Sequence, residues 1–146
     1  MFGKIKERLT GGASRLTGKT DLLEAIAAAC VLVAAADGEI EDEEVAATMA
    51  ALTTHATLTA AFKTSEIERV TDGMFRRAGQ GRAGRLGLKR EIEQAKARSS
   101  TEDLEMLLVI AVDVSMSDGE MEPAERVVLG QIADIVGLPL ARYLDA

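Results

Sequence analysis

An acidic stretch occurs twice in this chain at a constant offset of 81 residues. The first copy occupies residues 36–44 (ADGEIEDEE) and the second residues 117–125 (SDGEMEPAE). Five positions coincide: Asp37 with Asp118, Gly38 with Gly119, Glu39 with Glu120, Glu41 with Glu122 and Glu44 with Glu125. The match continues upstream into an apolar segment, so that Leu23 falls on Leu104 and Val33 on Val114. Each copy is therefore an apolar segment, an acidic turn and a second segment, which predicts a duplicated helical hairpin.

The residues that must form the core are helix formers. Apolar residues make up 47% of the chain and aromatic residues only 3%, and two prolines are present among 146 residues. A core built from Ala, Leu, Val, Ile and Met, with no strand signal of any length, is typical of an all-α protein. We expect a single compact domain over residues 1–146, with about seven to eight helices built around two pseudo-symmetric hairpin repeats.

Charge divides the chain into four segments. The leader, residues 1–19, carries five basic residues and one acidic residue, and residues 63–98, expected to be connecting helices, carry ten basic and five acidic residues. The repeat units are the opposite: residues 20–62 carry eight acids and no base, and residues 99–146 carry ten acids and two bases. This alternation predicts a negative surface for cations and a positive surface for anionic partners. It gives no case for sequence-specific nucleic-acid binding.

Helix boundaries follow from caps and breakers. We expect the first repeat helix to run from Thr20 to Asp37, with Gly38 in the left-handed position that follows it. The second copy places Pro123 at the first helical position, which makes Glu122 the N-cap and Glu125 the third helical residue. Four glycines within residues 79–87 predict a connector, with the basic helix after it beginning only at Leu88.

The acidic turns are the candidate site. If the hairpins pack together, four to eight carboxylates share one surface, and oxygen ligands in that number suit Ca²⁺, with Mg²⁺ and Mn²⁺ as alternatives. The principal candidate ligands are Asp37, Glu44, Asp118 and Glu125, and the secondary ones are Glu39, Glu41, Glu120 and Glu122. The competing interpretation is that these acids only favour the starts of the following helices. The spacing does not fit an EF-hand loop, because position twelve is Thr48 or Leu129.

Catalysis has little support in the sequence. His55 is the single histidine and lies in a Thr-rich stretch, where a surface or loop role is expected. Cys30 is the single cysteine and lies in an Ala/Val segment, where an inert core thiol is expected. No nucleotide-binding or zinc-protease motif is present. The longest uncharged apolar run, residues 25–36, is too short to span a bilayer. The sequence therefore predicts a protein that is not an enzyme.

The repeated Ala-Asp-Gly-Glu-x-Glu-x-x-Glu pattern resembles the TerB family of bacterial tellurite-resistance proteins. The likeness covers nearly the whole chain and includes the opening at residues 1–6, both Asp-Gly turns with Glu44 and Glu125, and the tail at residues 132–138. The resemblance implies an all-helical fold of two similar halves with an acidic surface thought to bind metal. By position, the acids at issue are Asp37, Glu44, Asp118 and Glu125.

The resemblance also implies a cellular setting. We expect a cytoplasmic, non-enzymatic adaptor or metal-sensing protein of a tellurite and stress-resistance system, with peripheral association at the inner membrane as an option. Its partners would be other tellurite-resistance proteins, among them a TerC-like membrane protein. Two alternatives stay open: enzyme-like participation in tellurite reduction through Cys30, and an ion-free structural interaction domain.

Overall fold

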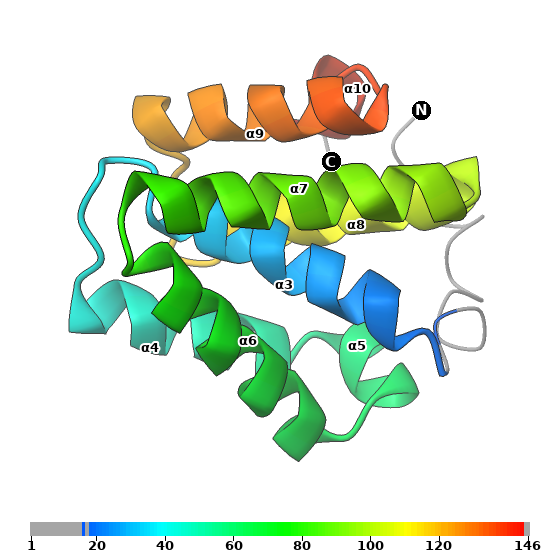
Figure 1. Cartoon of the computed structure of the whole chain (residues 1–146), viewed down its shortest axis with the longest axis horizontal. Coiled ribbons are helices and arrows are strands. Elements are labelled where there is room, and N and C mark those ends of the chain that lie inside the picture. Colours follow the sequence, from blue (N-terminus) through cyan, green and yellow to red (C-terminus); the bar gives the residue numbers. More distant parts are fainter. Residues whose placement is uncertain (1–15, 17, 145–146) are drawn as a thin grey trace.

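Two apolar helices form the centre of the structure, a computed structural model that describes residue 16 and residues 18–144. They are α3 (Thr20–Ala34) and α8 (Thr101–Ser115), the first helices of the two repeats. Twelve residues of each helix are buried, because almost every face of both is apolar and packs on a neighbour. In Figure 1, α3 runs through the middle of the molecule with α8 behind α7.

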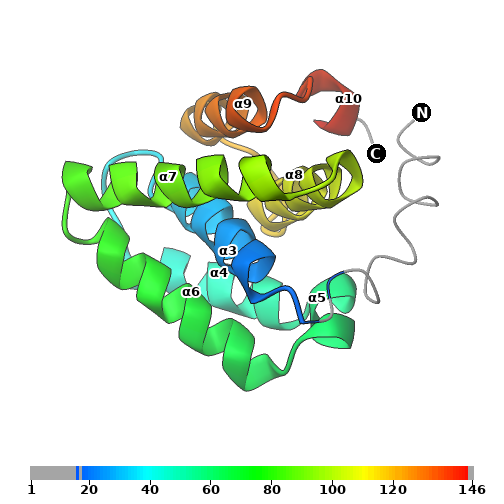
Figure 2. The same cartoon turned by 45° about the vertical axis from the view of Figure 1, so that its right-hand side comes forward.

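Six further helices of the described part of the chain enclose this pair. They are α4 (Asp42–Thr53), α5 (Ala56–Ala61), α6 (Thr64–Ala78), α7 (Arg82–Arg98), α9 (Pro123–Val136) and α10 (Ala141–Leu144). Helices α6 and α4 cover one side of α3, and α7 and α9 cover another (Figures 1 and 2). Helices account for 77% of the structure, and no strand occurs in residue 16 or residues 18–144. The expected all-α domain of seven to eight helices is confirmed.

The two hairpins have the same register. Helices α3 and α8 begin at Thr20 and Thr101 and end at Ala34 and Ser115, so both ends are related by the 81-residue offset. The second helices, α4 and α9, begin at Asp42 and Pro123 with the same offset. The repeat seen in the sequence is therefore a repeat of structure.

Two predicted helix boundaries are wrong. Helix α3 ends at Ala34 rather than Asp37, and Gly38 lies in the following turn with φ of +88° instead of directly after the helix. Helix α7 begins at Arg82 rather than Leu88 and includes two of the connector glycines. Gly84 explains the second error: a Cβ there would lie 1.7 Å from the carbonyl oxygen of Arg77. A glycine that breaks isolated helices here lets α6 and α7 approach closely.

The remaining local expectations concern the ends of the chain and the membrane. Most of the basic leader, residues 1–15 and 17, lies outside the described residues. Among the helices that the structure describes, none has the length and apolar character needed to cross a bilayer.

Candidate functional site

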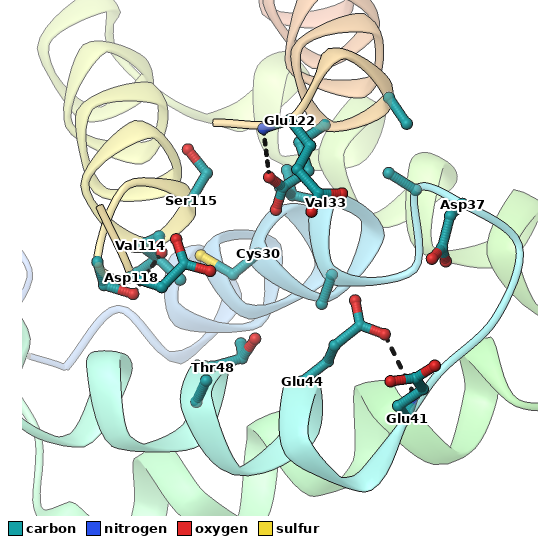
Figure 3. Close-up of a pocket in the computed structure, with 16 residues that line it drawn as sticks. Cys30, Val33, Asp37, Glu41, Glu44, Thr48, Val114, Ser115, Asp118 and Glu122 are labelled. Carbon is teal, nitrogen blue, oxygen red and sulfur yellow. Dashed lines mark hydrogen bonds between the residues drawn. The ribbon is translucent and has the colours of Figure 1, made fainter. Parts of the chain in front are cut away.

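Both acidic turns open onto one hollow. It has a volume of about 240 Å³ and lies where the ends of α3 and α8 meet the starts of α4 and α9 (Figure 3). Six carboxylates line it, three from each repeat: Asp37, Glu41 and Glu44 from the first, and Asp118, Glu122 and Glu125 from the second. The structure thus brings together all four principal candidates and two of the secondary ones. Glu39 and Glu120 are exposed and do not line the hollow.

The aspartates are placed by the two reversals of the chain. Asp37 and Asp118 come just after α3 and α8, and each precedes a glycine with positive φ, +88° at Gly38 and +109° at Gly119. Glycine adopts this conformation without the steric cost that other residues incur. One oxygen of Asp37 also accepts a hydrogen bond of 3.0 Å from the backbone N–H of Glu39, which holds the first turn closed.

The glutamates are placed by the starts of α4 and α9. Glu44 Oε1 accepts a hydrogen bond of 3.3 Å from the N–H of Glu41, and Glu125 Oε1 accepts one of 2.8 Å from the N–H of Glu122. Each of these contacts is one half of a capping box, one at the start of α4 and one at the start of α9. The capping role of these acids is therefore observed. A carboxylate has about four lone-pair sites, and one hydrogen bond leaves most of that capacity free. Capping therefore does not prevent the same side chains from binding a cation.

The two turns also interact electrostatically. The pKa of Glu44 is raised above its usual value of 4.5, first by burial and then by repulsion from Asp37, Glu41 and Glu125. Burial likewise raises the pKa of Glu125, and repulsion from Asp118, Glu122 and Asp37 adds to the effect. In both cases the cap hydrogen bond acts in the opposite direction. Since each glutamate feels a carboxylate of the other repeat, the hollow is one electrostatic unit.

As the side chains stand, this unit is not a finished coordination shell. No three His, Cys, Asp or Glu side chains in the described part of the chain lie close enough to hold one metal ion. The acids form an open ring around the hollow, and they would have to converge to bind a cation together.

A comparison with protein families fits this arrangement of two acidic turns. The model of the family described as Tellurite resistance protein TerB matches residues 23–146. The chain belongs to this family. Membership indicates a role related to tellurite resistance. The match includes both hairpins and both acidic turns of the TerB fold, and it leaves out the opening at residues 1–6 that also resembles the family. No curated protein and no solved structure matches the chain.

Cys30 lies on α3 at the inner end of the TerB acidic hollow, with its sulfur visible in Figure 3. Only 1% of the residue is exposed, and burial, followed by the charge of Asp113, raises the pKa of the thiol to about 12. The thiol is therefore protonated at neutral pH, which makes it a poor nucleophile and a poor metal ligand.

His55 lies outside the hollow. Its Nε2 atom is 3.1 Å from Oδ2 of Asp113 on α8, and the histidine side chain is 17% exposed. Its Nδ1 atom is buried without a hydrogen-bond partner in the described structure. The sequence predicts a surface or loop position for His55, and the residue directly precedes α5. The sequence gives no sign of the pairing with Asp113, which joins residues 58 positions apart.

Two polar residues of the inner wall were not among the candidates. Thr48 and Ser115 are 7% and 5% exposed and also line the hollow. Thr48 has a recognisable signal, because it is the polar member of the inward stripe of α4 that also contains Val45 and Leu52. Ser115 has none: the equivalent position of the first repeat is Ala34, so the repeat does not mark it.

Proposed function

We propose that this chain is a non-enzymatic adaptor of a tellurite-resistance system that senses a divalent cation. The observation that carries the proposal is that three carboxylates from each repeat line the same hollow. Burial and repulsion raise the pKa of Glu44 and Glu125 there, so negative charge is unfavourably crowded. A bound cation would relieve this crowding, because its positive charge offsets the repulsion among the carboxylates.

The donor set favours a hard cation. Six of the side chains that line the hollow are carboxylates, and none of the lining residues is a histidine. Ca²⁺ takes six to eight oxygen ligands in flexible geometry, which suits acids that must move to converge. Mg²⁺ and Mn²⁺ are the alternatives. Zn²⁺ and Cu²⁺ prefer imidazole and thiolate, but Cys30 is protonated and His55 lies elsewhere.

Sensing follows from the position of the ligands. The acids lie on the turns that join α3 to α4 and α8 to α9, so one ion bound by both turns would link the two hairpins. Without the ion the turns repel each other, and with it they are drawn together. The cation concentration would then set how firmly the two repeats are joined at this end of the molecule.

The adaptor part of the proposal concerns partners. The chain would work in the cytoplasm, with peripheral association at the inner membrane, and would dock to other tellurite-resistance proteins such as a TerC-like membrane protein. The unequal distribution of charge supports this role, because basic residues gather in the segment that forms α6 and α7 and leave a positive surface apart from the acidic hollow.

Calorimetric titration of the full chain with Ca²⁺, Mg²⁺ and Mn²⁺ tests cation binding. We expect saturable binding that becomes at least about tenfold weaker in the double variant Asp37→Asn/Asp118→Asn, because two ligands lose their charge. The matched control is Glu39→Gln/Glu120→Gln, which removes the same charge from the same turns outside the hollow and should change affinity by no more than about twofold. No heat and no thermal shift with any of the three ions would refute the proposal.

One observation favours a second candidate, an ion-free interaction domain. The caps made by Glu44 and Glu125 explain part of the acidic pattern without any ion. This candidate predicts that Asp37→Asn/Asp118→Asn leaves both tellurite resistance and the response to cations unchanged. The cation proposal predicts that resistance of cells carrying that variant falls while the fold, checked by circular dichroism, is retained.

A further inference from the structure

A second hollow lies beside the acidic one and has the opposite charge. Its volume is about 690 Å³, and it lies between the starts of α7 and α9, over the end of α3. Figure 1 shows these three points at the same end of the molecule. Leu32 and Val128 contribute to its lining, and Leu86 and Val127 line it while remaining 48% and 61% exposed. They are two of the three large hydrophobic side chains that are exposed in the described structure.

Basic side chains form one edge of this groove. Arg82, Arg85 and Lys89 lie on one stripe of α7 at spacings of three and four residues. No Asp or Glu of the described chain lines the groove, and the first turn of α7 contains no acid. None of the three cations is in an ion pair within the described residues. The backbone N–H groups at the start of α7 add further positive potential.

We propose that this groove binds an acidic amphipathic helix of a partner protein. Apolar side chains of such a helix would contact Leu86 and Val127, and carboxylates along its edge would pair with Arg82, Arg85 and Lys89. An amphipathic helix in a groove is a common mode of recognition, read by residues at i, i+3, i+4 and i+7. Arg82, Arg85 and Lys89 are three and four residues apart, which is about one helical turn. Acids on successive turns of a partner helix that lies along α7 would therefore each be next to one of these cations. The proposal deepens and rests on the adaptor part of the proposed function, and it does not require the cation.

Charge and shape disfavour the other occupants. The leader of this chain, residues 1–19, has five basic residues and one acid, so the basic groove repels it. A lipid surface is best met by apolar side chains that protrude, whereas here they line a hollow. A second copy of the chain supplies acids, but its acidic residues concentrate on turns rather than on one exposed apolar helix face.

The two hollows share a wall. Ala36 and Ala124 line both of them, and each directly precedes an acid of the cation site, Asp37 and Glu125. A partner helix in the groove would therefore lie next to the turns that the cation draws together.

The test uses a fluorescent, helix-stabilised peptide of about four turns, with leucines at the i, i+3, i+4 and i+7 positions and glutamates elsewhere. It is titrated against the full chain in EDTA, so that failure of the groove and failure of the cation site are distinguishable. We expect saturable binding, amide shifts in nuclear magnetic resonance spectra confined to residues around Leu86 and Val127, and binding at least about tenfold weaker when lysines replace the glutamates.

Variants with matched controls locate the contact. Arg85→Glu should weaken peptide binding about tenfold, whereas Arg90→Glu, the same charge change on an exposed residue of α7 outside the groove, should weaken it no more than about twofold. Val127→Asn tests the apolar contact without a charge change and, at 61% exposure, leaves the core intact. Equal effects of Arg85→Glu and Arg90→Glu, or an unchanged affinity in Val127→Asn, would overturn the proposal.

Two other outcomes would assign the groove to a different occupant. If vesicles of phosphatidylcholine and phosphatidylglycerol bind the chain and Arg85→Glu abolishes that binding while the peptide fails, the occupant is a membrane. If sedimentation velocity shows a dimer that Val127→Asn dissociates, the occupant is a second copy of the chain. Either result overturns the peptide proposal.

Discussion

Glu44 and Glu125 each have two roles, and these have opposite effects on the pKa of the side chain. As third residues of α4 and α9 they accept a hydrogen bond from the N-cap N–H, which stabilises the charged carboxylate. As lining residues of the hollow they are half-buried beside other acids, which disfavours the charged form. For both residues the unfavourable effects prevail and the pKa is raised.

This balance predicts a pH dependence of stability. A raised folded-state pKa means that the folded chain binds the proton more tightly than the unfolded chain, so the stabilisation is full below the unfolded pKa of 4.5 and is lost as pH rises through the folded pKa. Glu125→Gln keeps an acceptor for the cap but cannot ionise. We expect it to raise the melting temperature at pH 7 and low salt by about 1–2 °C, or roughly 0.5 kcal/mol, and to lose this advantage towards pH 4.

Melting curves followed by circular dichroism between pH 4 and pH 7 check this expectation. Glu39→Gln is the control, because Glu39 is exposed and lies outside the hollow. If the difference between Glu125→Gln and the unaltered chain does not change with pH, the crowding of charge in the hollow is not the cause.

Cys30 gives a second prediction at the scale of one residue. With the pKa of its buried thiol at about 12 instead of 9.0, the thiolate fraction at neutral pH falls by about a thousandfold. We expect Ellman's reagent to react with the unfolded chain and not, on the same timescale, with the folded chain. Cys30→Ala should cost about 1 kcal/mol of stability and preserve tellurite resistance in cells. Loss of resistance by a folded Cys30→Ala protein would instead support redox participation of the thiol.

At the scale of helices, the sequence predicts local features such as the caps, but it does not predict where two helices pack closely. Pro123 and Glu125 act within one turn of the chain, and their predicted positions in α9 are confirmed. The predicted start of α7 is wrong because glycine propensity favours a connector, whereas the close approach of Arg77 to Gly84 comes from the crossing of two helices. Propensity is a weak guide wherever a tertiary contact selects the residue.

Gly84→Ala tests that explanation. The new Cβ would lie 1.7 Å from the Arg77 carbonyl oxygen, and backbone atoms cannot yield as a flexible side chain can. We expect a loss of about 3 kcal/mol in the free energy of unfolding, measured by urea denaturation. Gly73→Ala in α6 is the matched control, because no atom lies within 4 Å of the position its Cβ would take. It should stabilise the chain by about 0.5–1 kcal/mol, and equal effects of both changes would contradict the packing explanation.

For the whole molecule, the sequence predicts which residues form the two acidic turns, but it does not predict that both turns line one hollow. The offset establishes that the two acidic turns are equivalent, and equivalent turns can lie at opposite ends of a molecule. They face one hollow because α3 and α8, buried over most of their surfaces, pack against each other at the ends that carry Asp37 and Asp118. The sequence predicts only the positive charge of the basic groove, because the apolar lining of the groove combines residues from three helices.

Sharing of one site by both repeats has a measurable consequence. At a Ca²⁺ concentration about a hundred times the dissociation constant, one bound ion stabilises the fold by about 2.7 kcal/mol. If Asp37 and Asp118 hold the same ion, either single change to Asn removes most of that stabilisation and the double variant removes little more. If each turn binds its own ion, the losses of the two single variants add up to that of the double. Melting temperatures with Ca²⁺ and with EDTA distinguish the two cases, and strictly additive losses would show two independent sites.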